Sequence, residues 1–136
     1  MRNMVLAIDG PSGAGKSSTA KAIAHRANWS YLDTGALYRA VTYLALENNI
    51  QDEDELVKQL QSAVIIFDTN PAHPKISVNN KDVSSEIRLE RINNFVSQVS
   101  AMPKVRKILL ELQRKYIGDA PIGIVVEGRD IGTVVA

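Results

Sequence analysis

The stretch MVLAIDGPSGAGKSS, residues 4–18, decides the fold. Its first part, residues 4–8, is a continuous apolar run, which is typical of a strand buried on both faces of a parallel sheet, and we expect it to be a central strand. A glycine-rich turn follows, and apolar residues then recur at helical spacing over residues 16–28. Strand, turn and helix are therefore contiguous, which predicts an α/β fold.

The turn itself, residues 10–17, satisfies the pattern GxxxxGK[ST] between a buried strand and a helix. Glycines let several backbone N–H groups converge on a phosphate, the helix N-terminus adds its positive end, and Lys16 adds a full charge. Ser17 can offer a hydroxyl to a magnesium ion. An ordinary glycine turn is the alternative, but it does not call for Lys-Ser at its end. A dinucleotide-binding fingerprint fails because Ser18 stands where its third glycine would be.

Length and composition narrow the class of protein. The chain has 136 residues, 45% of them hydrophobic and 23% charged, which predicts a folded chain of one domain. The net charge of +1 gives no global field for nucleic acid or an anionic membrane, and no apolar run approaches the ~20 residues that span a bilayer. The absence of cysteine excludes disulfides and thiolate chemistry and fits a cytoplasmic location.

The rest of the chain continues the α/β pattern with one interruption. In chain order it predicts a strand at 29–32, a helix after the turn at 34–35, a short helix capped by Asp52 and Glu55, strands at 64–67, at 76–78 and around Val83, helices at 86–100 and 104–116, and a buried strand at 122–126. We therefore expect a core in residues 1–62, a small antiparallel insertion in 63–84, and helices with a third core strand in 85–136.

Polar side chains follow two of the predicted strands, where open α/β sheets bind ligands. Tyr38 and Arg39 come after the strand at 29–32, and Arg39 could clamp a phosphate through two donors. The alternative is that Arg39 is a solvated helix residue and Tyr38 a core residue. Arg129 and Asp130 follow the strand at 122–126, where a salt-bridged turn is the alternative.

An acidic partner for magnesium is expected at the same edge. Asp33 and Glu127 both end a predicted strand, and carboxylate oxygens are ligands that magnesium accepts. The sequence does not choose between the two.

Four ordered motifs give the chain a family resemblance. IDGPSGAGK at 8–16, LDTGALYRA at 32–40, SQVSAMPKVR at 97–106 and EGRDIGTVV at 127–135 resemble the motifs of the bacterial cytidylate kinases, a branch of the P-loop nucleoside monophosphate kinases. The resemblance implies a P-loop kinase fold, with a parallel sheet covered by helices on both faces and an antiparallel monophosphate-binding insertion. It also implies transfer of the γ-phosphate of ATP to CMP or dCMP, with magnesium, in pyrimidine nucleotide metabolism.

The resemblance also assigns residues. It implies that the ATP phosphates are held by Gly10, Pro11, Ser12, Gly13, Ala14, Gly15, Lys16, Ser17 and Ser18. It implies that CMP is contacted by Thr34, Tyr38, Arg39, Ser97, Arg106, Gly128, Arg129 and Asp130. Lys16, Arg39 and Arg129 would be the catalytic residues, and Ser17 would contact magnesium.

Members of this family are longer than this sequence. We therefore expect the carboxyl-terminal strands and the lid to be absent, so that the strand at 4–8 has a bare edge through which the chain self-associates, whereas the full-length protein is a monomer. We also expect little or no activity from these 136 residues alone. Two alternatives stay open: a nucleotide-binding module without activity, and a P-loop kinase for another small acceptor such as shikimate.

Overall fold

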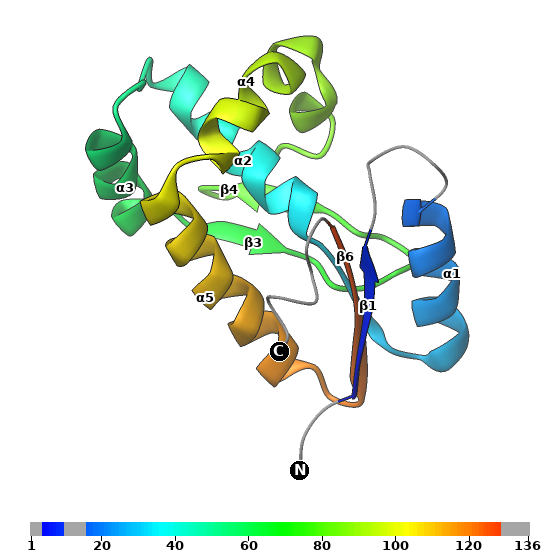
Figure 1. Ribbon diagram of the computed structural model, residues 1–136. Coiled ribbons are helices and arrows are strands. Elements are labelled where there is room, and N and C mark those ends of the chain that lie inside the picture. The colour runs from blue at the N-terminus through cyan, green and yellow to red at the C-terminus, as the bar shows by residue number, and fades with distance from the viewer. Residues whose placement is uncertain (1–3, 10–15, 129–136) are drawn as a thin grey trace. The chain divides into compact units, whose positions relative to one another are not determined.

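The computed structural model describes residues 4–9 and 16–128, apart from the side chains of Asp9 and Lys16 (Figure 1). The chain divides into two compact units. One comprises Met1–Gly35, Asp68–Pro74 and Leu110–Ala136, and is called here the parallel-sheet unit. The other comprises Ala36–Phe67 and Lys75–Leu109, and is called the antiparallel-sheet unit.

The parallel-sheet unit contains three strands, β1 (Met4–Asp9), β2 (Ser30–Asp33) and β6 (Gly123–Gly128). They are parallel in the order β1-β6-β2, so the last of these strands in the sequence lies between the first two. Figure 1 shows β6 beside β1. Every residue of β6 is buried, as a continuous apolar run in a parallel sheet predicts. The predicted combination of a parallel sheet, helices and a small antiparallel sheet is confirmed.

The prediction that residues 4–8 form a strand is confirmed, and in the described sheet this strand has the bare edge that was also expected of it rather than a central position. The prediction that it is buried on both faces is wrong. Among the described residues, β1 pairs with β6 alone and lies at the edge of the sheet. Met4 is 64% exposed and Leu6 39% exposed. Because alternate side chains of a strand share a face, one face of β1 is left uncovered by the described part of the chain.

Helix α1 (Lys16–Ala27) packs against β6 and β2. Its contact stripe is made of small residues, and Ala20 and Ala24 are fully buried. Asn28 ends the helix with a left-handed φ of 60°, and the next residue, Trp29, donates its backbone N–H to the Ala24 carbonyl at 2.8 Å.

The Trp29 indole lies directly on the backbone of β6. A Cβ added at Gly123 would lie 2.6 Å from two ring carbons of Trp29. Real Cβ atoms essentially never come that close to another heavy atom, so only glycine lets the ring approach the strand at this position.

Helix α2 (Thr34–Glu47) begins in the parallel-sheet unit and continues into the antiparallel-sheet unit. Helix α3 (Glu53–Ser62) follows, and the backbone N–H of Glu55 donates to the Asp52 carboxylate at 3.0 Å. This N-cap confirms the helix start that the spacing of Asp52 and Glu55 predicts.

The second sheet is antiparallel, with β3 (Ile65–Phe67), β4 (Ile76–Val78) and β5 (Lys81–Asp82) in that order. Asn79 and Asn80 join β4 to β5 with φ values of 51° and 69°. Two successive residues with positive φ form the tight hairpin turn whose twist matches the flanking strands, and asparagine tolerates that conformation. The predicted antiparallel strands are therefore confirmed.

The predicted helix at 86–100 is interrupted. A 3₁₀ turn, η1 (Glu86–Arg88), is followed by α4 (Glu90–Ser100), because Leu89 between them is extended with ψ of 152°. Helix α5 (Pro103–Asp119) confirms the last predicted helix and starts at a proline, which needs no N–H partner there. The apolar core of this unit is drawn from α2, α3, β3, β4, η1, α4 and the first half of α5, and includes Leu37, Val41, Leu56, Ile76, Ile87, Ile92, Val105 and Leu109.

None of the helices in the described part of the chain combines the length and the apolar character needed to cross a membrane.

Candidate functional site

The carboxyl ends of β2 and β6 bring polar groups together in the parallel-sheet unit. Asp33 lies opposite Glu127 in the register of the two strands. The Tyr31 hydroxyl donates to Oε1 of Glu127, and the Thr34 hydroxyl donates to the Glu127 carbonyl oxygen at 2.9 Å. Tyr31 is 2% exposed and Glu127 1% exposed, so this carboxylate is held inside the unit by a hydroxyl donor.

The same tyrosine reaches the end of the predicted phosphate loop. Burial raises the pKa of Tyr31, the negative charges of Asp33 and Glu127 raise it further, and a hydrogen bond with the Ser17 hydroxyl opposes the rise. The phenol is therefore neutral at ordinary pH and contacts both Ser17 and Glu127. Sequence reasoning missed Tyr31. The available signal was that a tyrosine in a buried strand needs a partner for its hydroxyl, and that Tyr31 shares a face of the strand with Asp33.

In the antiparallel-sheet unit, the structure brings two predicted acceptor residues together. Tyr38 is half-buried on α2, and Arg106 is exposed near the start of α5. Burial raises the pKa of Tyr38, while the charge of the Arg106 guanidinium and its hydrogen bond to the tyrosine oppose the rise. The Tyr38 hydroxyl and the Arg106 guanidinium are therefore neighbours, and a guanidinium at this position can also bind an anion.

Arg39 lies one residue further along α2 and is also held. Its Nη1 donates to the Ile87 carbonyl oxygen at 3.2 Å and to Oδ1 of Asn93 on α4. Ser97, the remaining predicted acceptor contact in this unit, is exposed on the same helix, four residues after Asn93. Four residues make about one helical turn, so Asn93 and Ser97 share a face of α4.

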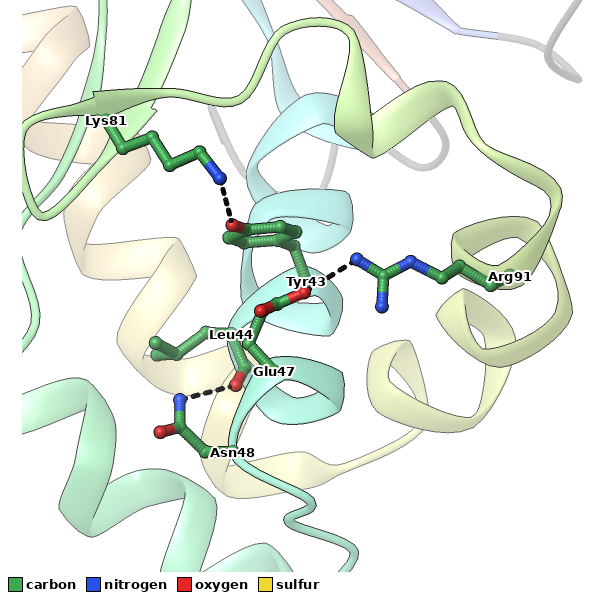
Figure 2. Close-up of polar contacts among 6 residues, drawn as sticks. All are labelled: Tyr43, Leu44, Glu47, Asn48, Lys81 and Arg91. Carbon is green, nitrogen blue, oxygen red and sulfur yellow. Dashed lines mark hydrogen bonds and ion pairs between the residues drawn. The ribbon is translucent and has the colours of Figure 1, made fainter.

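A third group of polar contacts surrounds Tyr43, about one turn after Arg39 on α2 (Figure 2). Nζ of Lys81 donates to the Tyr43 hydroxyl at 3.1 Å and lies 5.6 Å from the ring centroid. The Arg91 guanidinium lies 5.9 Å from the same centroid and pairs with Glu47 at 2.7 Å. These contacts tie β5 and α4 to α2 and were not predicted.

The other predicted site residues fall largely outside the described residues. Residues 10–15, the Lys16 side chain, Arg129 and Asp130 lie there, so their assigned roles stay predictions. Ser18 is exposed on α1. Gly128 ends β6 with a φ of 155°, a conformation that residues with a side chain rarely adopt.

Magnesium was predicted at the carboxyl edge of the sheet. The donors found there, the Ser17 hydroxyl and the carboxylates of Asp33 and Glu127, are the hard oxygen ligands that magnesium prefers. The described residues contain no group of three or more His, Asp or Glu side chains that could hold a metal ion by themselves. Such a donor set fits magnesium that is held mainly by the phosphates of a nucleotide.

Comparison with known proteins gives one consistent result. The model of the cytidylate kinase family matches residues 6–136. A cytidylate kinase of Streptomyces griseus is 48% identical over 135 residues, which cover 98% of this chain and 58% of that protein. A cytidylate kinase of Carboxydothermus hydrogenoformans is 48% identical, with 97% of this chain and 60% of that protein covered.

A fused relative matches as well. A bifunctional pantoate ligase/cytidylate kinase of Prochlorococcus marinus is 46% identical over 137 residues, which cover 98% of this chain and 26% of that protein. The sheet and its helices are those of an α/β protein, consistent with a P-loop kinase fragment. The chain belongs to the cytidylate kinase family. It spans about three fifths of the length of the single-function relatives that it matches.

Proposed function

We propose that the protein to which this chain belongs transfers the γ-phosphate of ATP to CMP or dCMP, giving CDP or dCDP. The observation that carries the proposal is the match of the cytidylate kinase family to residues 6–136, supported by relatives of that name at 48% identity. The fold and the polar groups of both units are compatible with it. The reaction would serve pyrimidine nucleotide metabolism in the cytoplasm.

Recognition of the acceptor falls to the side chains of α2, α4 and α5 together with residues 128–130. The Arg39 guanidinium would bind the acceptor phosphate with Arg129, because a guanidinium offers parallel donors to two oxygens. Cytosine presents an exocyclic amine and a carbonyl, which a carboxylate and an arginine can recognise. Asp130, Arg106 and Ser97 would supply these contacts, while Thr34 and Tyr38 would lie beside the acceptor.

The donor would be held by residues 10–18, with Lys16 on the phosphates. Ser17 would hold a magnesium ion from the protein side, with Asp33 or Glu127 in support. Of these two carboxylates, Glu127 is 1% exposed and already accepts the Tyr31 hydroxyl, whereas Asp33 is half-buried. Asp33 is therefore better placed to face a nucleotide. A bound magnesium ion supplies positive charge to the donor phosphates.

In the proposed reaction, no group of the protein forms a covalent bond to the substrates. An oxygen of the acceptor phosphate attacks the γ-phosphorus of ATP, the bond from that phosphorus to the β,γ-bridging oxygen breaks, and ADP leaves with the electron pair. The attacking oxygen is already anionic, so no general base is needed, and in-line positioning and charge stabilisation by Lys16, Arg39 and Arg129 carry the catalysis.

The test is isothermal titration of the chain with CMP, UMP and ATP, with a coupled assay of phosphate transfer from ATP and magnesium. Binding of CMP with a clear preference over UMP supports the proposal, and turnover of CMP extends it to catalysis by this chain. Binding of ATP without CMP would leave a nucleotide-binding module and contradict the acceptor. Phosphorylation of a different small acceptor, with CMP inert, would overturn the proposal.

A further inference from the structure

The Arg39 guanidinium is oriented by two neutral oxygen atoms. Its Nη1 donates to the Ile87 carbonyl oxygen at 3.2 Å and to the amide oxygen of Asn93. Among the described residues, no carboxylate forms an ion pair with Arg39. The guanidinium is thus oriented by neutral oxygen atoms, and none of the described residues neutralises its positive charge.

Neutral hydrogen-bond partners leave an arginine with the positive charge and the N–H donors that bind a phosphate. A guanidinium has five N–H donors, and a bidentate contact with a phosphate uses two of them. Both described contacts use Nη1, so Nη2 and Nε keep donors for an incoming anion. A carboxylate in place of Asn93 would compete with the phosphate for the same charge, whereas an amide oxygen only fixes the orientation.

The two oxygen atoms that accept hydrogen bonds from Arg39 are themselves held in place. Ile87 is 4% exposed, so its backbone is anchored by its own buried side chain. Helix α4, which carries Asn93, is tied to α2 by the pair between Arg91 and Glu47 at 2.7 Å (Figure 2). Arg39 and Glu47 both lie on α2, and their partners Asn93 and Arg91 both lie on α4. The two helices are therefore joined at two places.

We propose that Asn93 is a positioning residue for the acceptor phosphate, orienting the Arg39 guanidinium through a neutral hydrogen bond before the nucleotide binds. This inference rests on the proposed function, because it takes Arg39 to contact that phosphate. Ordering a long side chain in advance lowers the entropy lost on binding. Asn93 does not touch the reacting atoms and acts through Arg39 alone.

The experiment compares the affinities of the chain for CMP and for cytidine by isothermal titration, in the wild type and in Asn93→Ala. The change removes the amide acceptor and leaves α4 a good helix former. We expect the affinity for CMP to fall about three- to tenfold, the effect of losing one hydrogen bond, and the affinity for cytidine to stay unchanged. Asn94→Ala, the neighbouring asparagine of the same helix, is the matched control and leaves both affinities unchanged.

A double-mutant cycle shows whether Asn93 works through the arginine. In an Arg39→Ala background, adding Asn93→Ala has no further effect on CMP affinity if the proposal holds. Asn93→Asp keeps an acceptor oxygen at this position but adds a negative charge beside Arg39. It should therefore weaken CMP binding more than Asn93→Ala does.

Three results would overturn the inference: unchanged or tighter CMP binding by Asn93→Ala, an equal loss of cytidine affinity, or an undiminished effect in the Arg39→Ala background. Each of these results is interpretable only if the wild-type chain binds CMP. Failure of the wild type itself to bind CMP is a different result, which contradicts the proposed function and removes this inference with it.

Discussion

The two units hold their polar side chains in different ways. In the parallel-sheet unit, the Tyr31 hydroxyl and the Glu127 carboxylate meet where both residues are almost fully buried. In the antiparallel-sheet unit, contacts such as Arg91 with Glu47 lie between side chains that are nearly half exposed. A buried polar pair costs much to break because neither group can turn to water, whereas an exposed pair exchanges its partner for solvent.

Because of this difference in burial, variants of the two units should test different properties, the stability of the fold in one and nucleotide binding in the other. Polar changes at the ends of β2 and β6 should lower the stability of the fold, so that an effect on nucleotide binding could not be separated from destabilisation. Changes at the exposed residues proposed to contact the acceptor nucleotide, Ser97 on α4 and Arg106 on α5, should alter binding while leaving the fold intact. Binding experiments on these two residues are therefore easier to interpret than binding experiments on the buried Glu127.

The largest expected difference between the two units is in the free energy of unfolding when one tyrosine hydroxyl is removed from each. Tyr31→Phe leaves the buried Glu127 carboxylate without this donor, and we expect it to lower the free energy of unfolding by about 1–3 kcal/mol. Tyr43→Phe removes a hydroxyl that accepts from the exposed Lys81, and should cost much less. Urea denaturation of both variants measures the comparison, and equal losses would contradict it.

The pH dependence of Tyr31→Phe gives a second readout of the same contact. The pKa of Tyr31 is raised in the folded protein above its ordinary value of about 10, so the folded state holds this proton more tightly than the unfolded state. Stability from this group is complete below about pH 10 and is lost as the pH rises above it. The alkaline loss of stability should be less steep in Tyr31→Phe than in the wild type.

An intermediate effect is expected where the two sheets have exposed edges. The apolar side chain of Leu6 is exposed on the six-residue edge strand β1, whereas Ile66 is 51% exposed on the three-residue edge strand β3. A long apolar edge is the better template for pairing with a second chain, so we expect concentration-dependent association through β1. Leu6→Lys should return the mass in light scattering toward that of a monomer.

Ile66→Lys is the matched control for this association. It places the same charge on the shorter edge strand of the other unit and should leave the mass unchanged. A wild-type chain that is monomeric at all concentrations would contradict association through β1.

The smallest effect is expected at the pair between Arg91 and Glu47, whose side chains are 45% and 46% exposed. Arg91→Gln should change the free energy of unfolding by less than about 1 kcal/mol, because an exposed ion pair gains little over solvation. Thermal unfolding at low and high salt measures it. A large, salt-sensitive loss would show that the two units do not differ in the way described.

The pattern of neighbouring residues in the sequence predicted most of the helices and strands, but not which strands lie beside one another in the sheet. The buried strand at 122–126 and the capped helix after Asp52 were predicted because apolar runs and side-chain caps act over a few residues. The position of β6 between β1 and β2 was not, because strand order depends on the packing of the whole chain. The break at Leu89 was also missed, since no proline or glycine marks it.

The candidate site shows the same limit. Tyr38, Arg39 and Arg106 were chosen from motifs, and the structure shows the contact of Arg106 with Tyr38. The contact of Tyr31 with Glu127 joins residues that are 96 positions apart, and nothing local to either residue specifies the other. Asn93 was missed for a different reason, because one asparagine on an exposed helix face resembles any solvated residue.

The order of strands also bears on how the protein folds during synthesis. Strands β1 and β2 are made early, but neither pairs with the other in the described sheet, and both pair with β6, near residue 128. At about 5–20 residues per second, a ribosome needs roughly 5–20 s to reach β6 after β2. During that interval the antiparallel sheet can close its short hairpin turn at Asn79 and Asn80. The described parallel sheet cannot form before β6 is made, so β1 and β2 stay without their sheet partner for longer than the strands of the antiparallel sheet do.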